Sequence, residues 1–179
     1  MDDAVFLTER GEPELVTATW PVRCYLVEHP NGLLLWDTGL PEPGSPADAL
    51  ALGEWAKISA PLLPWLGERG ITGQDFTYLG FSHVHIDHAG NANLFPTSTV
   101  LLGAREHVHA FGPNVRDPYQ PDDYAGLRES KTVLVDDQYD VFGDGAVMIV
   151  AAPGHSPGHQ VLVLTIAGQA PLILVGDAF

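Results

Sequence analysis

Basic residues are scarce in this chain of 179 residues, which holds 8 lysines and arginines against 23 aspartates and glutamates. The formal net charge is −15, and the few basic residues are scattered along the sequence. Nucleic-acid binding depends on clusters of basic side chains that neutralise phosphates. We therefore expect no nucleic-acid partner, and a small, neutral or weakly charged molecule as the substrate.

The chain also lacks long apolar runs, a basic leader and a second cysteine. No apolar run approaches the roughly 20 residues that cross a bilayer. Residues 1–10, MDDAVFLTER, open with two acids where a secretory signal would carry basic residues. We therefore expect no membrane partner and a cytoplasmic location. Cys24 is the only cysteine, which excludes an intrachain disulfide, and its apolar neighbours predict a small buried side chain.

Apolar runs separated by turn residues predict most of the secondary structure in a single domain over residues 1–179. Residues 21–30 and 32–40 flank a Pro-Asn-Gly turn and predict a β-hairpin. Helices are expected over residues 47–57 and 104–111, and the Pro- and Gly-rich residues 112–130 predict a long loop. Strands and helices do not alternate regularly, which favours an α/β sandwich of sheets flanked by helices. Further strands are expected over residues 77–82, 98–103, 131–135, 139–153, 159–166 and 171–179.

The densest chemical pattern is residues 81–90, FSHVHIDHAG, where three of the 8 histidines flank an aspartate. Side chains two residues apart in an extended segment point the same way, so His83 and His85 can present their imidazoles to one point. Asp87 and His88 follow where the strand should end, and a turn would carry them to a second point nearby. A lone histidine is usually a surface side chain, but this density favours a metal site. Imidazoles with a carboxylate suit zinc, and iron or manganese accept the same mixture.

Two later segments offer further ligands. His155 follows a strand in the Pro- and Gly-rich residues 151–160, AAPGHSPGHQ, and Asp177 ends an apolar strand, where an isolated aspartate more often caps or turns the chain. His159 has a supporting role or none. His107 and His109 are two residues apart on an expected helix and point to different faces, so we expect surface or packing histidines there.

Together these motifs resemble the metallo-β-lactamase-fold hydrolases. SHVHIDHAGN matches that family's His-x-His-x-Asp-His motif, PGHSPGH its second metal loop, and GDA the segment of its bridging aspartate. LLLWDTGL resembles its Asp-Thr-Gly turn, in which Asp37 would support the metal ligands from behind. The motifs follow the family's order from about Val22 to Phe179. The resemblance implies a four-layer αββα sandwich with the site along one edge of the two facing sheets.

The resemblance also implies two metal ions, with zinc as the expected metal. The family's second ion takes one further histidine well beyond the bridging aspartate, and the sequence ends two residues after Asp177. We therefore expect the given sequence to lack the C-terminal part of the domain. Carried over position by position, the ligands of the first ion are His83, His85 and His155, and those of the second are Asp87, His88 and the bridging Asp177.

Within the superfamily, the motifs look most like those of the N-acyl homoserine lactone lactonases. That resemblance implies a zinc-dependent hydrolase in which a hydroxide held by the metal ions opens a lactone or ester, while Asp87 passes a proton to the leaving group. A thioester or sulfate-ester hydrolase of the same fold is the alternative, and a metal-binding fragment without activity is a third possibility. Ser156 stands beside His155, but no nucleophile-elbow motif supports a serine hydrolase. The oligomeric state stays open.

Overall fold

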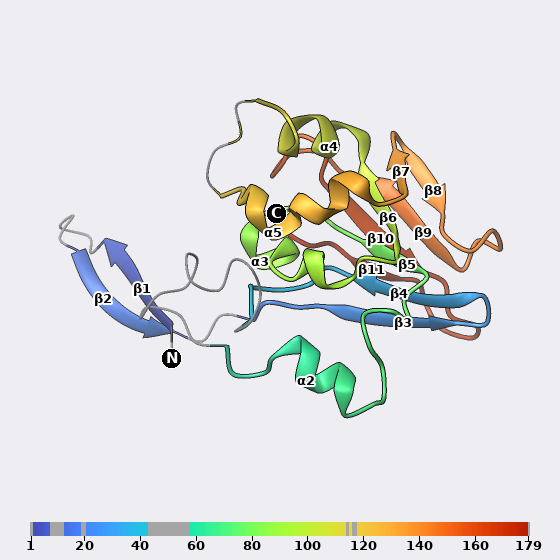
Figure 1. Cartoon of the computed structure of the whole chain (residues 1–179), viewed down its shortest axis with the longest axis horizontal. Helices are drawn as coiled ribbons and strands as arrows, with labels where there is room; N and C mark the ends of the chain where they lie inside the picture. The colour runs from blue at the N-terminus through green and yellow to red at the C-terminus, as the bar shows by residue number, and fades with distance from the viewer. Residues whose placement is uncertain are drawn as a thin grey trace.

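Two facing β-sheets form the body of the molecule in the computed structural model, which describes residues 2–7, 13–18, 21–42, 58–113, 115 and 118–178 (Figure 1). The five-stranded sheet has the order β3-β4-β5-β6-β7, with β3 Tyr25–His29, β4 Gly32–Trp36, β5 Tyr78–Gly80, β6 Thr99–Gly103 and β7 Thr132–Val135. The four-stranded sheet has the order β11-β10-β9-β8, with β8 Gln138–Asp140, β9 Val147–Ala151, β10 Gln160–Leu164 and β11 Leu172–Leu174. A separate antiparallel pair consists of β1 Asp2–Leu7 and β2 Pro13–Ala18.

Strand direction determines where functional side chains can gather. β3 and β4 form the expected antiparallel hairpin, and Gly32 has a φ of +139° in its turn, where a Cβ would lie 2.1 Å from Thr77 Oγ1. Only glycine fits that backbone position. β4, β5, β6 and β7 pair in parallel, so their carboxyl ends meet at one edge of the sheet. In sheets of this kind ligands bind outside the carboxyl ends of the strands.

Two apolar cores lie on the two faces of the five-stranded sheet. Successive residues of β4 alternate between them: Leu34 and Trp36 face the other sheet, and Leu35 faces the helices. Because both faces are covered, β4 is an almost continuous apolar run. The core that contains Leu35 lies between this sheet and the helices. Its helical segments, among the described residues, are α2 Leu62–Gly67, α3 Ile86–Ala89, η1 Ala92–Leu94, α4 Ala104–Ala110, α5 Pro121–Tyr124 and η2 Ala125–Glu129.

These helices cover the outer face of the five-stranded sheet, so the described residues form helix, sheet and sheet layers of the expected αββα sandwich. The mixed α/β class and the helix over residues 104–111 are confirmed. The expected long loop is wrong in part, because α5 and η2 occupy residues 121–129. Pro121 suits the first turn of a helix, and Tyr124 and Leu127 bury their side chains. The helix expected over residues 47–57 lies outside the described residues.

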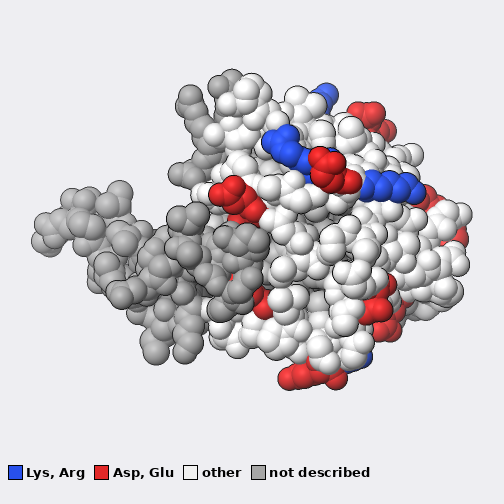
Figure 2. All heavy atoms as spheres, viewed as in Figure 1, with Lys and Arg blue, Asp and Glu red and all other residues white. Residues whose placement is uncertain are grey.

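Charged residues make up 17% of the chain, and few of them are basic. On the described part of the face shown in Figure 2, basic side chains are few and stand beside acidic ones. Among the described helices, none has the length and apolarity needed to cross a bilayer.

Candidate metal centre

The histidine-rich segment leaves β5 at its carboxyl end and enters a single turn of helix. His85 is the extended residue before α3, and its carbonyl accepts the backbone N–H groups of His88 (3.0 Å) and Ala89 (2.9 Å). His85 therefore lies in extended backbone, as expected, and the expected turn at Asp87 and His88 is α3 itself. Its short length places His88 against the end of the hairpin.

Three histidines converge at this edge. One ligand atom from each of His83, His85 and His155 lies within 4.8 Å of the other two. His155 Nε2 is 3.1 Å from His85 Nδ1, and the ring centroids of His83 and His155 are 4.6 Å apart. The sequence placed these same three residues around one ion, and the structure brings them together.

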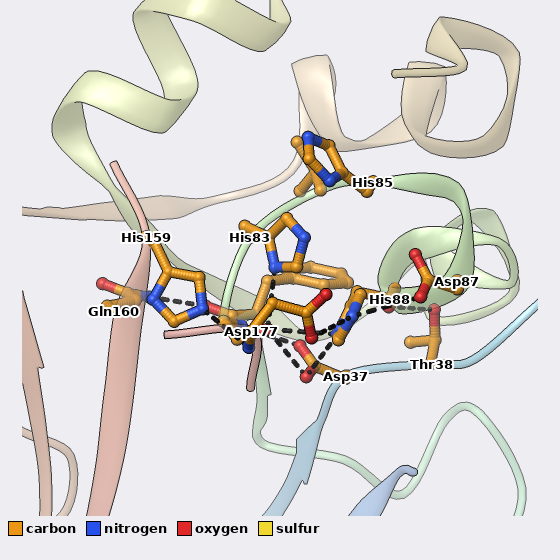
Figure 3. A network of polar contacts seen from close by, with 12 residues as sticks. Asp37, Thr38, His83, His85, Asp87, His88, His159, Gln160 and Asp177 are labelled. Carbon is orange, nitrogen blue, oxygen red and sulfur yellow. Dashed lines mark hydrogen bonds and ion pairs between the residues drawn. The ribbon is translucent and has the colours of Figure 1, made fainter. Parts of the chain in front are cut away.

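A second group shares His83 and adds His88 and Asp177, with ligand atoms again within 4.8 Å of one another. Asp177 Oδ1 lies 3.2 Å from His88 Nε2, and Asp177 Oδ2 lies 3.6 Å from His155 Nε2. The carboxylate of Asp177 thus stands between the two groups, and Figure 3 shows it facing His88. Asp87 is more peripheral: its Oδ2 is 3.5 Å from His88 Nε2, its side chain is 34% exposed, and it belongs to neither three-residue group.

Asp37 holds His88 from behind, as the resemblance implied for its position. It is buried, has a φ of 60°, and follows β4 directly. Its Oδ1 accepts the backbone N–H of Ser82 (2.7 Å), and its Oδ2 accepts the Ser82 hydroxyl (2.9 Å). His88 Nδ1 lies 2.9 Å from Asp37 Oδ2 and donates to it, which leaves His88 Nε2 directed at Asp177 (Figure 3). A carboxylate behind an imidazole in this way fixes the tautomer that a metal ion needs.

Burial and neighbouring charges separate the histidine pKa values. Burial, together with the neighbouring imidazoles, lowers the pKa of His83 strongly and that of His85 to about 4. These two rings are therefore neutral, which is the form that binds metals. Burial also disfavours charge on His88, but hydrogen bonds and charges from Asp37 and Asp87 outweigh it and raise the pKa of His88 to about 10, so a metal ion that binds Nε2 would displace a proton from it.

The donor set fits a divalent cation. His83 Nε2 is buried and has no hydrogen-bond partner among the described residues, a costly state unless something else binds it. Tetrahedral ligands that each lie about 2.0–2.1 Å from a zinc ion are about 3.4 Å from one another. The 3.1 Å between His155 Nε2 and His85 Nδ1 is close to that spacing. Imidazoles with one shared carboxylate are ligands that zinc and similar metals accept.

A cavity of about 490 Å³ opens beside the second group. Asp87, His88 and Asp177 line it, with Arg23 from the segment before β3. Its volume falls within the range of small-molecule sites, so the candidate ligands adjoin a space that can hold a substrate.

Other histidines, and one glutamate, behave differently from the candidate ligands. His107 and His109 pack against Phe111 and Tyr119 and belong to no metal group among the described residues, as expected of packing histidines. His159 is fully buried, and its Nε2 accepts the backbone N–H of Asp177 (3.2 Å), which is a supporting contact. Sequence reasoning missed Glu106, a fully buried acid behind the first group. Its position three residues after a strand is typical of a residue near a site at the edge of the sheet. Glutamates in the first turn of surface helices occupy the same position, so the sequence alone does not distinguish the two cases.

The fold and this centre define a class: a two-sheet α/β sandwich with a histidine- and aspartate-rich candidate metal site at one edge. Residues 18–179 match the sequence profile of the Metallo-beta-lactamase superfamily, and the chain belongs to that superfamily.

Relatives with known names are similar over most of the chain. An N-acyl homoserine lactonase, AttM, of Azorhizobium caulinodans is 32% identical, with 88% of this chain and 65% of the relative covered. An N-acyl homoserine lactonase of Bacillus cereus is 30% identical, with 88% and 64% covered. The chain thus spans about 65% of the length of the curated relatives it matches.

Two solved structures of N-acyl homoserine lactone hydrolases are similar to this chain in fold. An N-acyl homoserine lactone hydrolase with the product N-hexanoyl-L-homoserine bound at its catalytic metal centre superposes with a TM-score of 0.71 at 26% identity, covering 93% of this chain and 66% of that one. A quorum-quenching N-acyl homoserine lactone hydrolase gives a TM-score of 0.73 at 26% identity, covering 96% and 67%.

Proposed function

We propose that this protein is a zinc-dependent hydrolase that opens lactones, with N-acyl homoserine lactones as the substrate class. The observation that carries the proposal is the convergence of five histidine and aspartate side chains, in two groups with one shared histidine, beside a cavity of about 490 Å³. The substrate class is supported by the curated relatives and by the similar structure with a homoserine product at its metal centre.

His83, His85 and His155 would hold one ion, and His88 with Asp177, assisted by Asp87, would hold another. Bound divalent ions polarise a carbonyl oxygen and lower the pKa of water from 15.7 to about 7.

The chain's own side chains have distinct roles in this proposal. Asp37 keeps His88 Nε2 directed at Asp177, and the charge of Asp177 offsets the repulsion between two cations. Although burial acts the other way, contacts with His88 lower the pKa of Asp87, so its carboxylate is ionised and can accept a proton. Water adds to the lactone carbonyl carbon and gives up a proton to Asp87. The ring C–O bond then breaks, the alkoxide takes that proton, and a hydroxy acid leaves.

The test is metal analysis of the purified protein together with hydrolysis of N-hexanoyl homoserine lactone, before and after chelation and after zinc is restored. We expect bound zinc, loss of turnover on chelation, and recovery on addition of zinc. His85→Ala should bind less zinc, while His107→Ala, a histidine outside the site, should behave as the unmodified protein. Undiminished turnover after complete removal of metal would refute the proposal.

A sulfate-ester or thioester hydrolase is the second candidate function, and one residue that lines the cavity favours it. Arg23 lines the same cavity as the acidic residues and can pair with an anionic group on a substrate. A panel of lactones, thioesters and aryl sulfates distinguishes these activities. Bound zinc without turnover on any of them would instead support a metal-binding protein without this activity.

A further inference from the structure

Glu106 is a buried carboxylate that accepts four hydrogen bonds. It lies in the first turn of α4 and is 0% exposed. Its Oε1 accepts the backbone N–H of Val84 (3.1 Å) and the hydroxyl of Tyr119 (3.1 Å). Its Oε2 accepts the hydroxyl of Ser156 (2.6 Å) and the backbone N–H of Gly158 (3.0 Å). Four donors offset the cost of burying a charge, so the carboxylate is held in one orientation.

The donors belong to the two loops that carry the first metal group. Val84 lies between His83 and His85, and Ser156 directly follows His155. Each oxygen of Glu106 therefore holds one loop.

Tyr119 adds a contact from a third segment. Its hydroxyl donates to Glu106, while its ring meets the ring of His85 edge to face, with centroids 4.6 Å apart and an interplanar angle of 87°. The orientation of His85 thus depends on the same carboxylate through a second path.

The loop after His155 is packed directly against the start of α4. A Cβ at Gly158 would lie 2.0 Å from the backbone N of Glu106, and a Cβ at Gly103 would lie 2.1 Å from the carbonyl O of Gly158. This close approach is what allows a side chain as short as glutamate to reach both loops.

We propose that Glu106 is a positioning residue whose carboxylate joins the loop of His83 and His85 to the loop of His155, and so sets the spacing of the three imidazoles for one metal ion. The inference rests on the proposed function in one respect, that these histidines bind metal. It does not depend on the substrate.

The substitution Glu106→Gln distinguishes a positioning role of the carboxylate from a role in which the side chain only fills space in the core. A carboxylate has two acceptor oxygens, but the amide of glutamine has only one. In either orientation of the glutamine amide, its NH₂ group points at a backbone N–H, that of Val84 or that of Gly158, and two donors cannot form a hydrogen bond with each other. One loop must therefore move while the volume of the side chain is kept.

Glu42 offers the matched control. It is also buried, and its carboxylate also accepts backbone N–H groups, those of Leu62 and Leu63 at the start of α2. Glu42→Gln makes the same change of charge and volume at a helix that carries no candidate ligand, while its amide oxygen can still accept both N–H groups at the place of Oε1.

The experiment measures three quantities for the whole chain: the melting temperature of the metal-free protein, zinc affinity by competition with a chelator, and the visible absorption spectrum of the Co²⁺-substituted protein. Both variants should lower the melting temperature. Only Glu106→Gln should weaken zinc binding, by about 10–100-fold as is typical for partners behind metal ligands, and change the cobalt spectrum. Ser156→Ala and Tyr119→Phe each remove one donor, and they should shift the spectrum in the same direction by less.

Zinc affinity and a cobalt spectrum unchanged in Glu106→Gln would overturn the proposal. If that variant does not fold, unchanged values in both Ser156→Ala and Tyr119→Phe would overturn it equally. Lactone turnover is scored separately. A protein whose zinc affinity depends on Glu106 but which hydrolyses no lactone refutes the proposed substrate and leaves the positioning role supported.

Discussion

Replacing Asp37 by asparagine should weaken metal binding without removing any ligand. In the structure Asp37 Oδ2 accepts from both the Ser82 hydroxyl and His88 Nδ1, at 2.9 Å each. Asp37→Asn keeps the Oδ1 contact to the backbone N–H of Ser82 and puts an NH₂ group where Oδ2 was. That group cannot accept from His88 Nδ1. His88 then carries its proton on Nε2, the atom that faces Asp177, and this tautomer cannot bind a metal there.

The magnitude follows from that loss of orientation. Removing a partner behind a metal-binding histidine typically costs about 10–100-fold in affinity, or about 1.4–2.7 kcal/mol. Among the ligands of the first group, His83 is linked to Asp37 indirectly, through the Ser82 hydroxyl that lies 3.1 Å from its Nδ1, so the ion of that group should be retained. We therefore expect zinc per chain, at a free zinc concentration set by a chelating buffer, to fall selectively in the weaker phase of the titration.

The control is Asp140→Asn. Asp140 also accepts two backbone N–H groups, from Gly143 (2.9 Å) and Gly145 (2.8 Å), but in the hairpin between β8 and β9. Its replacement should leave zinc binding as it is. Identical zinc titrations for Asp37→Asn and the unmodified protein would show that His88 does not need this carboxylate.

Three further predictions concern the rest of the molecule. Burial, followed by the charges of nearby acids, raises the pKa of Cys24 from 9.0 to about 12. Because a thiolate of higher pKa is also more nucleophilic, iodoacetamide at pH 8 should alkylate Cys24 about 30–60-fold more slowly than a free thiol, and an ordinary rate contradicts this. Burial and the charge of Asp122 raise the pKa of Asp123 from 3.8 to about 7, so the unfolded chain loses this proton first, and stability falls between about pH 4 and pH 7. Asp123→Asn should accordingly raise the melting temperature relative to the unmodified protein at pH 8 but not at pH 4, and an equal effect at both pH values would refute the shift. Leu162→Ala, in the core between the sheets, should lower the free energy of unfolding by about 2–5 kcal/mol in urea denaturation, whereas Ile166→Ala, 44% exposed, should change it by about 0.5 kcal/mol or less.

Local patterns allowed part of the site to be predicted, because the relevant geometry spans few residues. The spacing that directs His83 and His85 to one point covers three positions, and the resemblance joined His155 to these two and gave Asp177 the bridging position. Glu106 was missed for the opposite reason. Its four hydrogen-bond donors are separated from it by 13 to 52 residues in the sequence. The local sequence is instead dominated by two neighbouring histidines, which pack against aromatic rings. The helical segments after residue 120 are not predicted by the sequence pattern, because their prolines and glycines are also typical of loops; a proline at the first turn nevertheless suits the start of a helix.

A rule of topology connects the residues that local reasoning treated separately. Asp37, His83 and Glu106 follow the carboxyl ends of β4, β5 and β6 within four residues, and His155 and Asp177 follow β9 and β11 in the same way. A residue just beyond a strand has left the hydrogen-bonded ladder, so its side chain can turn across the edge of the sheet while the strand holds its backbone. Polar residues in such positions on several strands therefore meet at one place even when nothing in the local sequence links them. Glu106 meets this condition as fully as the histidines do, and this is the physical reason to assign it to the candidate metal centre rather than to the surface of its helix.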